Sequence, residues 1–393
     1  MLHQPLRAAA TCCLAVIGAC GITEVTSEEL SPIVRRDAVA FTGPSVPPEV
    51  LDRLAANRLV ILGETHFLQE HRAFLAALVR DLHARGFRQL MMELPHMVDW
   101  LLRDHARNGQ LLPGWTPPAS LVGGLIEPVR EFNRTLPPDQ QFDLRAIDVN
   151  LDDYGGAGAF VDLLGVLAGH LNGPGPVQEF LTRPYTTAAA QTASLTALQS
   201  ALAARRTELT ASWGADRYQT VAEMVEVELA SVRIRDIRED DYDRSAKLRE
   251  NEIKRLADVR LAGYPFRSLV NVGGNHAQKA RFKGTDQEWL GDYLAHRSTA
   301  VGGTVIVISV GAARIVAASG ASLFDIMNAS PANELWRTMH EAWPGQSVFL
   351  PLDDPMFLRG GIAVNYEGEI YVTAIKKAYD ALLLFPLAYR IPL

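Results

Sequence analysis

Cysteine is almost absent from this chain of 393 residues. The three cysteines are Cys12, Cys13 and Cys20, and none follows position 20. The body of the protein therefore has no cysteine nucleophile, no thiolate metal site and no disulfide. Its chemistry must depend on other side chains.

An excess of basic residues is also missing. The chain has 38 Lys and Arg residues against 45 Asp and Glu residues, and its net charge is −7. No basic face that would neutralise phosphates stands out, so we expect no nucleic-acid partner. The composition is 48% hydrophobic and 21% charged, which allows a large core and excludes global disorder.

Several sequence signatures of known chemistry are absent. There is no G-x-S-x-G elbow, which disfavours a serine hydrolase of the α/β type. There is no H-E-x-x-H zinc motif and no G-x-x-x-x-G-K-[ST] phosphate loop. Beyond the N-terminus no uninterrupted apolar run reaches about 18 residues, so we expect no transmembrane helix.

The N-terminus has the pattern of an export signal. Arg7 precedes an apolar stretch from Ala8 to Gly18, which is too short to span a bilayer, and Ile17-Gly18-Ala19-Cys20 resembles a bacterial lipobox. We predict a lipoprotein signal peptide over 1–20, with Cys20 lipidated and the protein anchored to a membrane, facing the periplasm or the cell exterior. The alternatives are an ordinary cleaved signal and an unprocessed hydrophobic start. Residues 21–50 end in a Pro-rich run, which indicates a tether.

The most informative stretch begins at Leu59. Residues 59–62 form an apolar run of strand length, which turns at Gly63 and places Glu64 and His66 where the strand ends. A helical period follows over 67–85. The next apolar segment, 88–94, has Glu93 near its end. This order predicts a βαβ unit, with two parallel strands and a right-handed crossover.

The same pattern recurs along the chain. Segment 142–149 contains Asp148 near its end, and segment 268–273 is followed by Asn275 and His276. Strands are also expected in segments 304–310, 314–318 and 379–385. Residues 157–262 are mostly helical, while 108–140 has the composition of a loop. We predict one α/β domain over 51–393, with three layers, a mostly parallel central sheet and a large helical insertion at about 157–262.

A parallel sheet brings the carboxyl ends of its strands to one edge. Glu64, His66, Glu93 and His276 are therefore expected to meet there, with Asp148 nearby. Two kinds of chemistry fit such a set. The side chains would bind a divalent metal, or they would carry out metal-free hydrolysis in which a carboxylate orients a histidine that activates water. The alternative to both is a set of buried polar groups with a structural role only.

Six motifs resemble, in order, those of the erythromycin esterase family. They are Leu62-Gly63-Glu64-Thr65-His66, the strand ending in Glu93, Ala146-Ile147-Asp148, the helical segment Arg244 to Asn251, Gly274-Asn275-His276-Ala277, and the terminal segment Ala378 to Leu383. The family belongs to a superfamily with the ChaN-like haem-uptake lipoproteins, TraB and the Tiki metalloproteases. This sequence departs from the usual family pattern at two positions. Only Thr65 separates Glu64 from His66, where the family usually has two residues, and Ser245 stands where the helical motif usually has Asp.

The resemblance implies a role for each matching residue. It makes His66 the water-activating base, with Glu64 and Glu93 as its orienting partners and His276 as the group that stabilises the intermediate or shuttles a proton. The residues that it places in substrate binding are Arg244, Asn251, Asp148, Asn275 and His71. For Arg244 a surface ion pair with Asp240 or Asp241 is the alternative.

Three functions follow from these branches. The first is an exported hydrolase that cleaves an ester, lactone or related acyl bond of a small-molecule substrate without a cofactor. The second is a metal-dependent hydrolase or peptidase of the Tiki and TraB type, with His66, Glu64, Glu93 and His276 as candidate ligands. The third is a lipoprotein of the ChaN type that binds haem or another small ligand.

Overall fold

A computed structural model describes residues 25–108, 124–172, 175–182, 187–280, 287–328, 334–359, 362–366 and 369–391. The predicted signal peptide and Cys20 lie outside these ranges, as does Trp115 of the expected loop. None of the helices within these ranges has an apolar stretch of the length that a membrane crossing needs.

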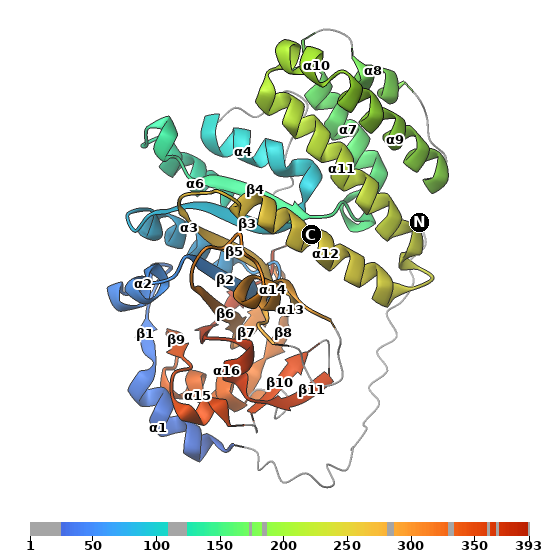
Figure 1. Ribbon diagram of the computed structural model, residues 1–393. Coiled ribbons are helices and arrows are strands. Elements are labelled where there is room, and N and C mark those ends of the chain that lie inside the picture. The colour runs from blue at the N-terminus through green and yellow to red at the C-terminus, as the bar shows by residue number, and fades with distance from the viewer. Residues whose placement is uncertain are drawn as a thin grey trace.

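The centre of the molecule is an eight-stranded sheet (Figure 1). Its order is β1 (Val39–Phe41), β9 (Ser347–Pro351), β12 (Ala381–Phe385), β6 (Val305–Ala312), β2 (Leu59–Glu64), β5 (Arg267–Gly273), β3 (Phe87–Pro95) and β4 (Asp143–Asp148). The six strands from β12 to β4 are parallel to one another, and β9 is antiparallel to both of its neighbours. The prediction of a mostly parallel sheet is confirmed.

Both faces of the sheet are buried. Along β2, Val60 and Leu62 belong to one buried apolar cluster, and Leu59 and Ile61 belong to the other, because side chains alternate across a strand. The first face is covered by α2 (Pro48–Ala55), α3 (Gln69–His83), α4 (Asp99–Asn108) and α6 (Ile126–Asn133). The second is covered by α1 (Ser27–Asp37), α12 (Tyr242–Leu261), α14 (Leu290–His296), α15 (Glu334–Ala342) and α16 (Ile375–Ala378). The architecture is a three-layer α/β fold.

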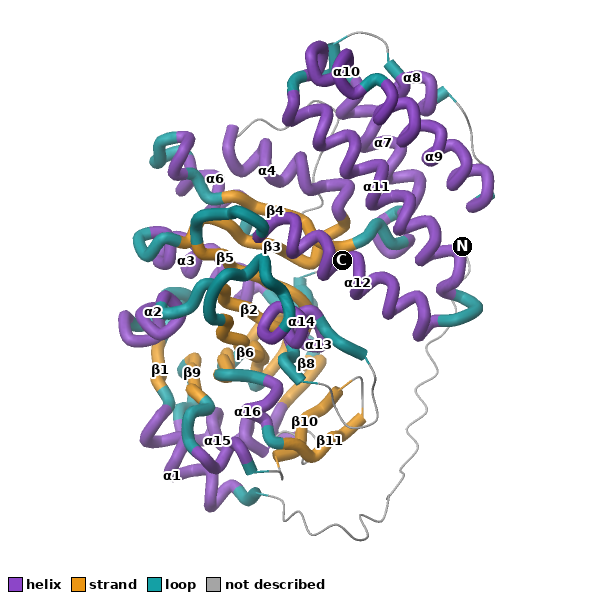
Figure 2. Tube along the Cα trace, viewed as in Figure 1, coloured by secondary structure: helices purple, strands orange, loops and turns teal. Residues whose placement is uncertain are grey.

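The helical insertion stands beyond the β4 edge of the sheet (Figures 1 and 2). It consists of α7 (Gly156–Ala168), α8 (Pro176–Leu181), α9 (Ala188–Ala204), α10 (Arg206–Trp213), α11 (Ala215–Arg238) and α12. Asp241 caps α12 by accepting a hydrogen bond from the backbone N–H of Arg244. Helix α12 then runs from the insertion back to the sheet and leads into β5. The prediction of a large helical insertion is confirmed.

Two segments expected to be irregular are folded. The tether predicted for 21–50 is wrong from Thr26 onward, because Thr26 and Glu29 form a capping box that starts α1. Strand β1 then pairs with β9 in the central sheet. Within the predicted loop over 108–140, α6 packs against α4 and α3.

Two small sheets flank the central one. Strands β10 (Ile362–Tyr366) and β11 (Glu369–Thr373) form one, and β13 (Ala388–Tyr389), β7 (Arg314–Val316) and β8 (Ser322–Asp325) form the other.

Candidate active site

The turn after β2 presents His66 at the surface. Glu64 ends β2, and His66 Nδ1 lies 3.1 Å from Glu64 Oε1. The next residue, Phe67, has φ 64°, a left-handed conformation that is uncommon for residues with a side chain and that clusters at functional sites. The backbone N–H of Ile391 donates to the Phe67 carbonyl at 2.8 Å, so the C-terminal segment holds this turn.

Glu64 is fixed from behind by a buried histidine. His71 Nε2 lies 2.9 Å from Glu64 Oε2 and 2.6 Å from Asn271 Oδ1 on β5. Burial favours protonation of Glu64, but the charge of His71 and the hydrogen bonds from His66 and His71 outweigh it and lower the Glu64 pKa. His71 is only 1% exposed. It cannot touch a substrate from there, so its predicted binding role is wrong, and it positions Glu64 instead.

Glu93 lies at the centre of the cluster. Strand β3 shifts its register between Met92 and Pro95, and such bulges re-aim side chains beside active sites. Glu93 Oε1 accepts a hydrogen bond from Arg249 at 2.6 Å and lies 3.3 Å from His276 Nε2. Its Oε2 accepts from the backbone N–H of Gly273 at 2.6 Å and lies 3.9 Å from His66 Nε2. Glu93 therefore connects the two predicted catalytic histidines.

Position 273 is a glycine because the His66 ring lies too close to it for a side chain. A Cβ atom at this position would lie 2.7 Å from His66 Nε2 and 3.2 Å from Glu93 Oε2. Cβ atoms in proteins essentially never come within 3.0 Å of a non-bonded heavy atom. The glycine that ends β5 thus leaves room for the imidazole and turns its own N–H toward the carboxylate.

His276 is held between two carboxylates. Its Nδ1 lies 2.5 Å from Glu250 Oε2, while its Nε2 faces Glu93. Glu250 is fully buried and also accepts a hydrogen bond from the backbone N–H of Leu290. Burial alone would lower the His276 pKa, but the charges of Glu250 and Glu93 raise it well above its usual value. Both ring nitrogens of His276 face carboxylates, and this arrangement favours the imidazolium form inside the cluster.

Arg249 supplies a second positive charge from α12. Its Nε lies 2.9 Å from Asp148 Oδ1 and its Nη2 lies 2.6 Å from Asp148 Oδ2, a bidentate pair that is strong and directional. Asp148 is fully buried. Its predicted contact with substrate is wrong, because its carboxylate is enclosed and paired with Arg249.

The structure brings Glu64, His66, Glu93 and His276 together at the carboxyl edge of the sheet. Asn275 lies in the short helix α13 (Gly274–Ala277), beside a cavity that adjoins Glu64. Arg249 and Glu250 were missed by the sequence analysis. A signal for Glu250 exists, because it shares one helical stripe with Ile253, Ala257 and Leu261, where a carboxylate is out of place without a partner.

Arg244 and Asn251 were predicted to point into the cleft, and the prediction is wrong. Both are exposed. They do share a helical face, but at about 100° per residue this face is roughly opposite the one that carries Arg249 and Glu250. The helical motif was identified correctly, whereas its inward-facing side was not.

Among the groups of this cluster, His66 is the most exposed to solvent. Its side chain is 46% exposed, whereas those of Glu93 and His276 are each 9% exposed. Burial lowers the His66 pKa, but the hydrogen bond to Glu64 and the charge of Glu93 outweigh it and raise the pKa above its usual value. His66 is thus an accessible base anchored through Nδ1, which leaves Nε2 to accept a proton.

The carboxylates of the cluster already accept hydrogen bonds from the protein. Glu64 faces two imidazoles, and Glu93 accepts from Arg249 and from Gly273. Within the described ranges no group of three or more His, Cys, Asp or Glu side chains is arranged to hold a metal ion. A cation bound between Glu64 and Glu93 would have to displace these donors.

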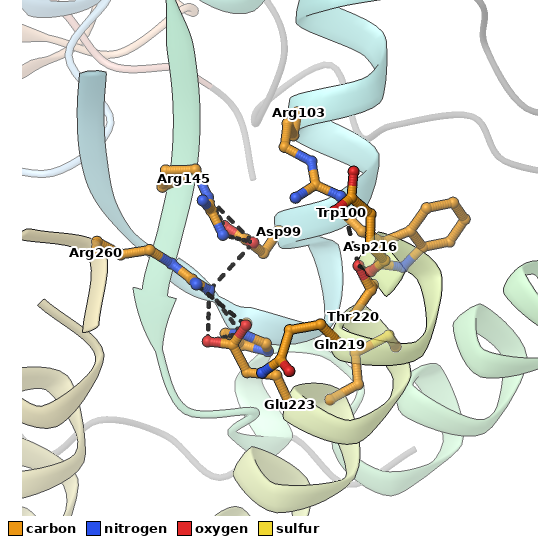
Figure 3. A pocket seen from close by; sticks show the side chains of 11 residues that line it. Asp99, Trp100, Arg103, Arg145, Asp216, Gln219, Thr220, Glu223 and Arg260 are labelled. Carbon is orange, nitrogen blue, oxygen red and sulfur yellow. Dashed lines mark hydrogen bonds and ion pairs between the residues drawn. The ribbon is translucent and has the colours of Figure 1, made fainter. Parts of the chain in front are cut away.

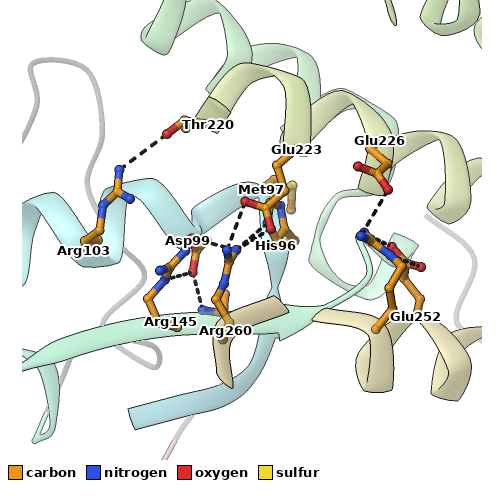
Figure 4. A network of polar contacts seen from close by, with 12 residues as sticks. His96, Met97, Asp99, Arg103, Arg145, Thr220, Glu223, Glu226, Glu252 and Arg260 are labelled. Atoms are coloured by element: carbon orange, nitrogen blue, oxygen red, sulfur yellow. Dashed lines mark hydrogen bonds and ion pairs between the residues drawn. The ribbon is translucent and has the colours of Figure 1, made fainter. Parts of the chain in front are cut away.

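A second charged cluster lies where the insertion meets the β4 edge, beside a cavity of about 210 Å³ (Figure 3). Asp99 accepts hydrogen bonds from Arg145 at 2.7 Å and from Arg260 at 3.3 Å. Arg260 also pairs with Glu223 at 2.7 Å and contacts His96 at 3.1 Å (Figure 4). This network joins α4, β4, α11 and α12, and its charges are paired with one another. We therefore assign it a structural role.

Comparison with known proteins supports the fold. No protein-family model and no curated protein matches the sequence. Among solved structures, the chain is similar to an erythromycin esterase, EreC, in its open conformation, with 18% identity, a TM-score of 0.61 and coverage of 88% of this chain and 94% of that one.

Two further structures are similar over most of their length. One is described as a succinoglycan biosynthesis protein, with 13% identity, a TM-score of 0.65 and coverage of 92% of this chain and 97% of that one. The other is a protein from Bacillus cereus, with 12% identity, a TM-score of 0.63 and coverage of 94% and 100%. The chain therefore shares the fold of these solved structures, among them the erythromycin esterase that its motifs resemble.

Proposed function

We propose that the protein is a hydrolase that cleaves an ester, lactone or related acyl bond with water activated by His66. The observation that carries the proposal is the exposed imidazole of His66, held through Nδ1 by Glu64, with Nε2 beside Glu93. A general base needs this combination of access, fixed orientation and a pKa near the working pH. The fold likeness to an erythromycin esterase supports an acyl bond as the target.

The proposed step is an addition followed by an elimination. Water attacks the carbonyl carbon while His66 Nε2 accepts one of its protons. The bond to the leaving oxygen then breaks, and His66 returns the proton to that oxygen. The positive charges of His276 and Arg249 stabilise the negative charge that develops on the carbonyl oxygen, because a preorganised charge acts strongly in a site with little water.

A panel of ester and lactone substrates, with and without chelator, tests the proposal on wild type and His66→Gln. General-base assistance contributes about 10²–10⁴-fold, so kcat should fall by about that factor in His66→Gln. His296→Gln is the matched control, because His296 is also exposed and lies 3.0 Å from a carboxylate, Asp292. Its activity should equal that of wild type, and circular dichroism should show all three proteins folded.

Three outcomes would contradict the proposal. Full activity of His66→Gln would remove His66 as the base. Activity lost to chelator and restored by a divalent cation would favour the metal-dependent hydrolase. Stoichiometric haem binding, followed by absorbance spectra, in a protein that hydrolyses no ester would favour the ligand-binding lipoprotein.

We further propose that the protein is exported and anchored to a membrane through a lipid on Cys20. The support is the lipobox-like sequence Ile17-Gly18-Ala19-Cys20 after a short apolar stretch. Mass spectrometry of the membrane fraction should find a diacylglyceryl Cys20 at the N-terminus. An intact Met1 terminus on protein from the soluble fraction would contradict this.

A further inference from the structure

A cavity adjoins the proposed catalytic cluster on the side of Glu64. It has a volume of about 340 Å³ and lies at the carboxyl ends of β2 and β6, next to the start of β12. Glu64 and Thr65 form one end of it. Its walls are largely apolar. They come from β7, from β8 and the residue that follows it, and from α15, α16 and β12: Ile315, Phe324, Ile326, Trp336, Ile375 and Leu382.

The cavity also has a small polar region. The side chains of Gln278, Ser309 and Tyr379 line it. The rest of the lining offers few groups that could hold water strongly, so an apolar ligand group is the occupant that this cavity favours.

We infer that this cavity holds the apolar part of the substrate. The substrate class is then an ester or lactone of a compact aliphatic or aromatic group. The cavity is at the small end of ligand pockets, which measure about 300–1,000 Å³, so it encloses a group of limited size. The identification of the ligand as a substrate rests on the proposed function, because it follows from the contact between cavity and Glu64.

Gly311 offers a way to fill the cavity without straining the fold. It lines the cavity on β6, and a Cβ there would lie 3.6 Å from the Trp336 ring, an ordinary contact distance. Gly311→Val should therefore narrow the cavity and leave the sheet intact, and Gly311→Ala is a milder form of the same change. Gly158→Val is the matched control, because Gly158 is exposed on α7 and a Cβ there meets nothing within 4 Å.

The test is calorimetric titration with 4-propylphenol. Wild type and His66→Ala should bind it with equal affinity, because His66 does not line the cavity. Gly311→Val should weaken binding at least tenfold, whereas Gly158→Val should match wild type.

The inference is overturned if 4-propylphenol does not bind saturably, or if Gly311→Val and Gly311→Ala bind it as tightly as wild type. Kinetics with 4-propylphenyl acetate separate this result from the proposed function. Hydrolysis that depends on His66 but not on Gly311 would retain the hydrolase and remove the cavity as its substrate site. Binding of the phenol that depends on Gly311, without hydrolysis of any ester, would retain the cavity as a binding site and remove the hydrolase.

Discussion

Two of the buried charge networks in the described part of the chain differ in one respect. In the network of Asp99, Arg145, Arg260 and Glu223, the charged groups pair with one another, and the pKa of Glu223 is about 2. That value results from His96 and Arg260, which together outweigh burial. In the cluster around Glu93 the carboxylates are paired in the same way, but His66 is half exposed and carries a raised pKa.

Helix α12 connects the two networks. It contributes Arg249 and Glu250 to the cluster around Glu93, and Arg260 to the other network. Arg249 and Arg260 are eleven residues apart, about three turns, so they lie on nearly the same face. Charges that are buried and paired, as in both networks, indicate a structural role. An exposed titratable side chain next to such a network, here His66, indicates a candidate catalytic group.

The largest effects on stability are expected from replacing Arg249 or Arg260, and the two variants should differ in activity. Arg249→Met and Arg260→Met each leave buried carboxylates unpaired, which costs about 3–5 kcal/mol of the free energy of unfolding. Both variants should therefore unfold at lower denaturant concentration than wild type. Below their unfolding transitions, only Arg249→Met should lose ester hydrolysis, by at least about tenfold, because Arg249 lies within the catalytic cluster.

The control for this pair is Arg297→Met. Arg297 is exposed and pairs with Glu288, and such surface pairs contribute about 0–1 kcal/mol. Equal loss of activity in Arg249→Met and Arg260→Met, measured on folded protein, would mean that the two networks do not differ in function.

A smaller effect on activity is expected from adding one methyl group at position 273. Gly273→Ala places a Cβ 2.7 Å from His66 Nε2, and the exposed imidazole must move away. A misplacement of about 1 Å costs up to about 10²-fold in rate, so kcat should fall with little change in melting temperature. Gly158→Ala on α7 is the control, because a Cβ there meets nothing within 4 Å. Equal kcat values for the two variants would show that the position of His66 is not critical.

The mildest effect is a pH dependence of stability. The folded-state pKa of His276 lies well above its usual 6.5, so its pairing stabilises the fold fully below about pH 6.5 and is lost as the pH rises through the raised pKa. The pKa of Glu93 lies well below its usual 4.5, mainly because the charge of His276 outweighs burial, so its contribution is present above pH 4.5 and is lost as the pH falls. Thermal melts of wild type should therefore decline on both sides, and His276→Gln should lose the alkaline decline. The same alkaline decline in His276→Gln would assign it to another group.

The sequence predicted the positions where strands end but not the directions in which helices face. Residues 59–66 and 268–276 were interpreted correctly, because an apolar run followed by glycine and a polar side chain has few other meanings in an α/β protein. The inward face of α12 was missed, since its mean composition is polar and Arg244 and Asn251 fit a motif by spacing alone. Asp148 and His71 were expected at the surface of the site. Whether a polar residue is enclosed depends on partners far away in sequence, here Arg249 and Asn271.

The most direct test of the central claim is the pH profile of kcat/KM, which reports ionisations of the free enzyme. If neutral His66 is the base, kcat/KM rises with pH and levels off above a pKa that lies higher than 6.5, as the hydrogen bond to Glu64 and the charge of Glu93 require. This rise disappears in His66→Gln and persists in His296→Gln. A profile that falls with pH over the same range, or one that is unchanged in His66→Gln, would contradict the account.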